Sequence, residues 1–182
     1  KLTGRPVIVY AVEMFNAGKI QASGGDQSIT INLSDVTGFT EALRGITGDK
    51  VDVILQSPGG SPEATESLVR LLRTRFKSIR FIVPMIAKSA ATMLAMSGDE
   101  IILGTNAELG PTDPQMVIGG KVSPAHAILQ QFKEAKTELG KNSAGLPAWL
   151  PILEQYGPSL ISQCTDAINL SESLVKQWLK QY

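Results

Sequence analysis

The sequence contains very little cysteine and histidine. Its 182 residues include one of each, Cys164 and His126. A single cysteine cannot form an intrachain disulfide, which favours a reducing compartment, so we expect a cytoplasmic location. The sequence also lacks a cluster of cysteines and histidines of the kind that binds zinc, and we expect no metal site.

The sequence also lacks an excess of charge of either sign, and it lacks long apolar runs. The chain has 17 Lys and Arg against 17 Asp and Glu, which gives a formal net charge of +0. It therefore lacks the long-range field that attracts nucleic acid. No apolar run approaches the roughly 20 residues that cross a bilayer, and no Gly-x-x-x-x-Gly-Lys-Ser/Thr loop for nucleotide phosphates occurs. We expect no nucleic-acid partner, no membrane span and no cofactor.

The apolar pattern predicts strands that alternate with helices. Strands are expected over residues 7–12, 28–33, 51–55, 79–85 and 100–103. Helices are expected over 39–46, from Pro62 to about Phe76 with Ser61 as N-cap, and over 89–96. This order predicts an α/β fold with a parallel sheet and crossover helices. A helix over 124–139 and two C-terminal helices follow, so we expect one domain over 1–182 with a helical appendage from about 122.

Two strand-to-helix junctions carry residues suited to chemistry. Paired glycines in Ser57-Pro58-Gly59-Gly60 let the backbone approach a ligand and direct N–H groups outward before a helix N-terminus. That arrangement suits an oxyanion hole. At the second junction, Ser89 begins a helix among small side chains, where a hydroxyl nucleophile is plausible. Because ligands bind at the carboxyl ends of parallel strands, both junctions are expected at the same edge of the sheet.

These motifs resemble the Clp-protease/crotonase superfamily, as represented by signal peptide peptidase A and the Clp proteolytic subunit. The resemblance rests on Leu-Gln-Ser-Pro-Gly-Gly at 55–60, Ala-Lys-Ser at 87–89 and Ser-Gly-Asp-Glu-Ile at 97–101. Lys-Ser-Ala-Ala-Thr at 88–92 and Leu-Gly-Pro-Thr-Asp-Pro-Gln at 109–115 are most similar to the serine dehydrogenase proteinase branch of signal peptide peptidase A-like proteins. The likeness covers roughly residues 7–115.

The resemblance implies a Clp/crotonase-like fold and a serine-type endopeptidase. Ser89 falls at the family's nucleophile position, and Gly59 and Gly60 fall in its oxyanion-hole loop. The N–H of Ala90 would be the second oxyanion donor. Thr92 is a weaker candidate for the nucleophile, because it breaks the register with the motif at 97–101.

The general base is the point at which this sequence departs from the Clp subunit. The segment that carries the catalytic histidine there reads Pro111-Thr112-Asp113-Pro114 here, and His126 is expected to be a solvated residue of a later helix. Signal peptide peptidase A relatives use a Ser-Lys dyad, in which burial lowers the pKa of a lysine. The base stays unassigned among Lys88, Lys121 and Lys141, while Lys133 and Lys136 are expected on a solvated helix face.

Asp113 lies near the place of the missing histidine and is a candidate to orient the base. Two other functions stay open: a non-catalytic oligomeric scaffold without a competent base, and a crotonase-like acyl-thioester enzyme. The superfamily implies a homo-oligomer and a peptide or unfolded-protein substrate. The extended segment at 116–120 could bind such a substrate as an added strand. Support for assembly comes from C-terminal apolar residues, namely Trp149, Leu150, Leu153, Tyr156, Trp178 and Leu179.

Overall fold

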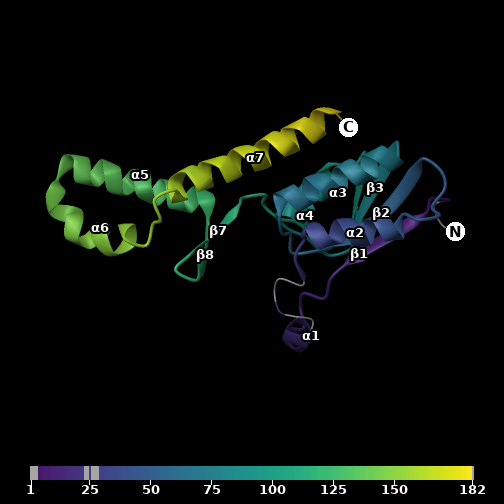
Figure 1. Ribbon diagram of the computed structural model, residues 1–182, viewed down its shortest axis with the longest axis horizontal. Coiled ribbons are helices and arrows are strands. Elements are labelled where there is room, and N and C mark those ends of the chain that lie inside the picture. Colours follow the sequence, from purple (N-terminus) through teal and green to yellow (C-terminus); the bar gives the residue numbers. More distant parts are fainter. Residues whose placement is uncertain (1–3, 23–24, 26–28, 182) are drawn as a thin grey trace. The chain divides into compact units, whose positions relative to one another are not determined.

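The computed structural model of the chain describes residues 4–22, 25 and 29–181 (Figure 1). Contacts between Cα atoms divide the chain into two compact units. The first unit comprises Lys1–Thr112 and Leu174–Tyr182, and the second comprises Asp113–Ser173. The expectation of a single domain over 1–182 stays a prediction, and each unit is described by itself below.

The first unit is an α/β structure built on a parallel sheet. Its elements are β1 (Val7–Ala11), α1 (Ala17–Ala22), α2 (Leu33–Ala42), β2 (Lys50–Gln56), α3 (Pro62–Arg75), β3 (Ser78–Val83), β4 (Ile86–Ala87), α4 (Ala90–Met96), β5 (Glu100–Leu103) and β6 (Glu108–Leu109). The main sheet has the order β1-β2-β3-β5, and all of its pairs are parallel. The predicted α/β class with a parallel sheet and crossover helices is confirmed.

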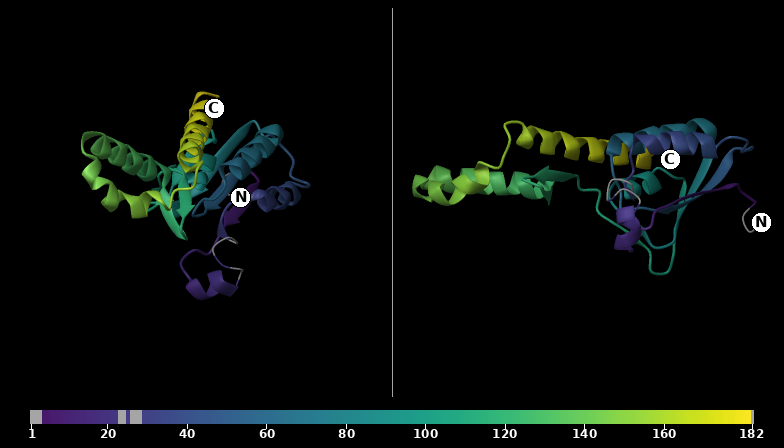
Figure 2. Two further views of the ribbon diagram at one scale, coloured as in Figure 1. Left: turned by 60° about the vertical axis from the view of Figure 1, so that its left-hand side comes forward. Right: turned by 60° about the horizontal axis from the view of Figure 1, so that its bottom comes forward.

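The core of the first unit lies between this sheet and helices on one of its faces. Figures 1 and 2 show α2 and α3 side by side over the sheet. Val53 and Leu55 of β2 and Phe81 of β3 are 0% exposed, as are Leu68 and Leu72 of α3. Burial of such apolar side chains stabilises the unit by about 1.5–3 kcal/mol each.

Helix α3 begins where the sequence predicts. The Ser61 hydroxyl accepts a hydrogen bond from the Ala64 N–H at 3.1 Å, and Pro62 occupies the first helical turn. The proline loses no hydrogen bond there, because the first N–H groups of a helix have no intrahelical partner. Local capping therefore places the helix start directly after the Gly59-Gly60 junction.

The strand expected over 28–33 is wrong in its described part, 29–33. Ile31 makes only an isolated bridge, and Leu33 is already the first residue of α2. Asn32 explains the change, because its side chain accepts from the Ser34 N–H while Asp35 accepts from the Asn32 N–H. This capping box starts a helix inside an alternating apolar pattern. The box makes α2 begin at Leu33, earlier than the predicted helix over 39–46, and α2 ends at Ala42. Ser28 lies outside the described residues.

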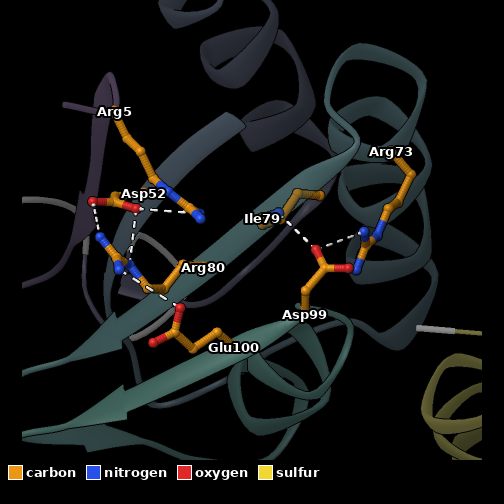
Figure 3. Close-up of polar contacts among 7 residues, drawn as sticks. All are labelled: Arg5, Asp52, Arg73, Ile79, Arg80, Asp99 and Glu100. Atoms are coloured by element: carbon orange, nitrogen blue, oxygen red, sulfur yellow. Dashed lines mark hydrogen bonds and ion pairs between the residues drawn. The ribbon is translucent and has the colours of Figure 1, made fainter. Parts of the chain in front are cut away.

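Charged side chains cross the sheet near the amino ends of its strands (Figure 3). Arg80 donates to both oxygens of the fully buried Asp52, at 3.0 and 2.8 Å. Arg5 approaches Asp52 at 3.7 Å, and Glu100 approaches Arg80 at 3.6 Å. The hydrogen bond with Asp52 raises the pKa of Arg80. The ion pair between Asp52 and Arg80 therefore joins β2 to β3. It lies near the amino ends of these strands, away from the two junctions that follow their carboxyl ends.

The second unit consists of a β-hairpin and helices. It contains β7 (Gln115–Ile118), β8 (Lys121–Pro124), α5 (Ala125–Lys141), a short 3-10 turn η2 (Ser143–Gly145) and α6 (Leu146–Leu153). The long helix α7 (Leu160–Gln181) contributes its residues 160–173 to this unit. Figure 2 shows α5 and α6 side by side. The small core of the unit comprises Ala125, Ile128, Leu160, Cys164 and Ile168.

The expected extended segment at 116–120 is one half of the hairpin. β7 pairs with β8 in antiparallel fashion, and Gly119 and Gly120 turn the chain with φ of 55° and 77°. Two positive φ values suit a tight hairpin turn, which glycine adopts without strain. Val117 and Val122 face each other in this register and are 72% and 66% exposed.

Across the part of the chain that the structure describes, no helix combines the length and apolar character required to pass through a bilayer.

Candidate active site

The Ser89 segment lies between two other segments beyond the carboxyl ends of the main strands. On one side, the Ser57 N–H donates to Ile86 O at 3.1 Å, and the Lys88 N–H donates to Ser57 O at 3.1 Å. On the other side, the Ser89 N–H donates to Pro111 O at 3.1 Å. The two junctions singled out in the sequence are therefore adjacent in the first unit, as their position at one sheet edge predicts.

Glycine is required where the junctions meet. A Cβ on Gly59 would lie 2.6 Å from Lys88 O and 2.7 Å from the Ser89 Cβ. A Cβ on Gly60 would lie 2.2 Å from Ile31 O. Gly59 and Gly60 also have φ of 104° and 153°, which L side chains rarely adopt. The paired glycines thus allow a close backbone approach that no other residue permits.

Ser89 has an unusual backbone conformation. With φ of 50° and ψ of −124°, it is the one residue other than glycine with positive φ among those described. It stands at the N-cap of α4, yet its side chain makes no capping hydrogen bond, in contrast to that of Ser61. A capping role therefore does not explain this serine. The half-buried hydroxyl is held on a strained turn, a kind of strain that clusters at functional sites.

Two backbone N–H groups beside Ser89 are suited to bind an anion. The Gly59 N–H donates to the Ser57 hydroxyl at 3.1 Å and is already used. Within the described ranges, the N–H groups of Gly60 and Ala90 have no hydrogen-bond partner. Ala90 is the first residue of α4, where an orphan N–H and the helix dipole favour negative charge. Of the three oxyanion candidates, Gly60 and Ala90 keep a free donor, while Gly59 shapes the loop.

Lys88 is engaged by a carboxylate. Its Nζ donates to Glu108 Oε2 at 2.6 Å, and its aliphatic stem passes over Gly110, where an added Cβ would lie 2.2 Å from the Lys88 Cδ. The hydrogen bond and the charge of Lys88 hold the pKa of Glu108 below its usual range. The Lys88 Nζ is thus directed to Glu108, and within the part of the chain that the structure describes no hydrogen bond joins it to the Ser89 hydroxyl.

The other base candidates lie in the second unit. Lys121 is an exposed residue at the start of β8, and Lys141 is the exposed last residue of α5. Asp113 is the first residue of this unit, and its Oδ1 lies 3.6 Å from His126 Nε2. His126 is 63% exposed, as expected, but its pairing with Asp113 was not anticipated. An imidazole beside a carboxylate is a common acid–base pair.

Thr92 is not available as a nucleophile. It is 1% exposed, and its hydroxyl donates to Ala87 O at 2.7 Å. The same oxygen accepts from the Gly110 N–H at 3.2 Å. The hydroxyl therefore uses its donor and one of its two acceptor positions within the fold. The sequence offers no signal for this pairing, because Gly110 belongs to a segment that only the tertiary structure brings close.

A strained serine beside paired backbone donors on an α/β sheet is the arrangement that a serine hydrolase needs for its nucleophile and oxyanion hole. The chain belongs to the family of ClpP-like SDH-type serine proteinases, whose model matches residues 27–143. The resemblance to the serine dehydrogenase proteinase branch is thereby confirmed.

Curated relatives occur in the archaeon Methanocaldococcus jannaschii. Uncharacterized protein MJ0137 is 37% identical over 87 residues, which cover 47% of this chain and 30% of that protein. Uncharacterized protein MJ1495 is 33% identical over 103 residues, which cover 56% of this chain and 34% of that protein. The chain thus spans about a third of the length of these relatives.

A solved structure with partial similarity is the ClpP protease catalytic domain from Plasmodium falciparum. It is 18% identical, with a TM-score of 0.35, and the match covers 40% of this chain and 50% of that one.

Proposed function

We propose that this chain is a serine peptidase in which Ser89 is the nucleophile. The observation that carries the proposal is the strained, uncapped Ser89 placed directly against the Gly59-Gly60 loop. The N–H groups of Gly60 and Ala90 would bind the oxyanion of the tetrahedral intermediate. Loss of one such donor in a serine peptidase typically lowers kcat by about 10²–10³.

The reaction proceeds by acyl transfer. The Ser89 Oγ forms a bond to the peptide carbonyl carbon while its proton moves to a general base, and the carbonyl π electrons become the oxyanion. Collapse of the intermediate breaks the C–N bond, and the base returns the proton to the leaving amine. Water then hydrolyses the ester by the same steps and restores the hydroxyl.

The base is proposed to be a lysine, as the Ser-Lys dyad of similar proteins implies. The ion pair of Lys88 with Glu108 disfavours that lysine and leaves Lys121 and Lys141. Asp113 is proposed to orient the base, and its pairing with His126 adds the imidazole as a further acid–base group for the same tests. The engagement of Lys88 is also the observation that favours the alternative of a non-catalytic scaffold.

A fluorophosphonate probe tests the nucleophile without a known substrate. Intact-mass spectrometry of the wild-type chain is expected to show one adduct, and Ser89→Ala is expected to show none. Ser97→Ala removes a buried hydroxyl that does not contact the Ser89 segment, so it serves as the matched control and is expected to keep the adduct. Absence of an adduct on the wild-type chain would favour the scaffold.

Four substitutions then separate the base candidates: Lys88→Met, Lys121→Met, Lys141→Met and His126→Gln. Loss of the base is expected to lower the labelling rate and to remove the pH dependence of labelling, because the proton acceptor is gone. A substitution that lowers the rate at every pH without changing the profile identifies a residue that is not the base.

The proposed substrate is a peptide or unfolded protein, and the proposed assembly is a homo-oligomer. Leu150 of the second unit is 46% exposed and Leu179 of the first unit is 62% exposed, so each unit offers an exposed apolar side chain for contact with another copy. Trp178, however, is 4% exposed and already packs within the chain. Light scattering at several concentrations tests the assembly, and a strict monomer would overturn it.

A further inference from the structure

The hydroxyl of Thr92 departs from the behaviour of five other helical threonines. A helical threonine commonly donates to the carbonyl four residues earlier. The side chains that do so here are Thr40, Thr65, Thr74, Thr137 and Thr165. Thr92 instead donates to Ala87 O, five residues earlier and outside its own helix. This hydrogen bond therefore ties α4 to the segment that precedes it and does not stabilise the helix itself.

This hydroxyl joins three segments around the nucleophile. Thr92 itself belongs to α4, Ala87 lies two residues before Ser89, and Gly110 directly precedes Pro111. The Gly110 N–H also donates to Ala87 O at 2.8 Å, so the three groups form a closed triangle of hydrogen bonds. Pro111 O in turn accepts the N–H of Ser89 at 3.1 Å. The triangle thus links the residues just before Ser89 to the Gly110-Pro111 segment that binds the Ser89 N–H.

A strained residue needs such support from its surroundings. A non-glycine residue at positive φ relaxes to an ordinary conformation unless its neighbours prevent it. The backbone on each side of Ser89 is held by bonds that converge on the Thr92 hydroxyl, which is 1% exposed. In the protein interior a hydrogen bond is electrostatically stronger than in water, and a buried polar group left without its partner is costly.

We infer that Thr92 is a positioning residue, whose hydroxyl keeps Ser89 and the Ala90 N–H in the geometry needed for attack. This inference rests on the proposed peptidase function. Thr92 acts through the backbone and does not touch the substrate. Small displacements of a reacting group lower rates by about 10²-fold, so loss of this hydroxyl is expected to lower the rate of acylation rather than the affinity for a ligand.

The test compares Thr92→Val with Thr92→Ser in labelling by the fluorophosphonate probe at increasing probe concentration. Thr92→Val keeps the shape of the side chain and removes the hydroxyl. It is expected to lower the limiting rate of labelling by about 10- to 100-fold with little change in the probe concentration at half-saturation. Thr92→Ser retains the oxygen and is expected to keep the wild-type rate to within about threefold, a smaller change than a lost hydrogen bond gives.

Ser97→Ala is the matched control. Ser97 is 1% exposed, and its hydroxyl donates to Leu94 O at 2.7 Å at the other end of α4. The variant therefore loses a buried hydroxyl of the same helix without touching the Ser89 segment, and it is expected to label at the wild-type rate. Thermal unfolding of all variants separates lost stability from lost positioning. Should Thr92→Val fail to fold, Thr92→Ala makes the same test with a smaller side chain.

The outcomes distinguish the inference from the function on which it rests. A slow Thr92→Val with normal Thr92→Ser and Ser97→Ala supports the positioning role. Equal rates for wild type and Thr92→Val, or an equal fall in Thr92→Val and Ser97→Ala, overturn that role while labelling of the wild type preserves the proposed function. A wild-type chain without any adduct overturns both.

Discussion

The strain at Ser89 leads to a prediction about stability that does not depend on activity. Replacement of Ser89 by glycine is expected to stabilise the folded chain. With φ of 50° and ψ of −124°, the residue occupies a region that glycine enters freely. The serine side chain makes no capping hydrogen bond, so its removal sacrifices none.

The size of the effect follows from two opposing terms. A residue in a sparsely populated region costs about 1–3 kcal/mol, and glycine removes that cost. Glycine also gives the unfolded chain more freedom, which opposes folding by about 0.5–1 kcal/mol. The two ranges together give a net gain of about 0–2.5 kcal/mol, centred near 1 kcal/mol. For a chain of this length, each kcal/mol moves the Tm by about 2–4 °C, so the centre of that range corresponds to a rise in Tm of about 2–4 °C for Ser89→Gly.

Calorimetry on three variants tests this reasoning. Ser89→Ala keeps a Cβ and hence the strain, so its Tm should stay close to that of the wild type. Ser61→Gly makes the same substitution at an N-cap with φ of −72° whose side chain accepts from the Ala64 N–H. It should lose a few tenths of a kcal/mol. A Tm for Ser89→Gly at or below that of Ser89→Ala would refute the claim that Ser89 is strained.

Three further predictions concern the surroundings of the site and the sheet. Gly60→Ala places a Cβ 2.2 Å from a neighbouring carbonyl oxygen and should lower the free energy of unfolding by about 3 kcal/mol in urea titration; a loss below about 1 kcal/mol would contradict this close approach. Lys88 holds the pKa of Glu108 low, so the pair stabilises the fold above the ordinary glutamate pKa and this contribution disappears as pH falls through the lowered value. Glu108→Gln should flatten the stability profile in that acidic window, and an unchanged profile would count against the ion pair. Asp52→Ala leaves Arg80, whose side chain is 15% exposed, without its buried partner and should cost about 3–5 kcal/mol in the same titration; a neutral result would show that the arginine finds other partners.

Local sequence signals predict the elements that depend on local chemistry. Helix α3 follows from Ser61, Pro62 and an apolar stripe, all of which act within one or two turns. The alternation of strands and helices likewise predicts the parallel sheet. Where two local signals compete, the prediction is wrong: the alternating residues at 29–33 suggest a strand, but the Asn32 capping box starts α2.

Contacts between distant segments are beyond such reasoning. The second strand of the hairpin, β8, carries no strong apolar pattern, and its pairing with β7 depends on the turn at Gly119 and Gly120. The partner of Lys88 is Glu108, 20 residues away. In both cases, the spacing along the sequence does not tell the true partner apart from other residues that could pair there.

For the candidate site, the sequence by itself determined the residue types: a serine before a run of small residues, and two glycines before a capped helix. Those choices are local, because φ preferences and capping act over a few residues. Only the tertiary structure decided that Gly59 lies against Ser89, that Ser89 is strained rather than a helix cap, and that the hydroxyl of Thr92 binds Ala87 and Gly110. The reason is physical: parallel strands bring their carboxyl ends together through crossovers, and the groups that meet there are separated along the chain by whole helices.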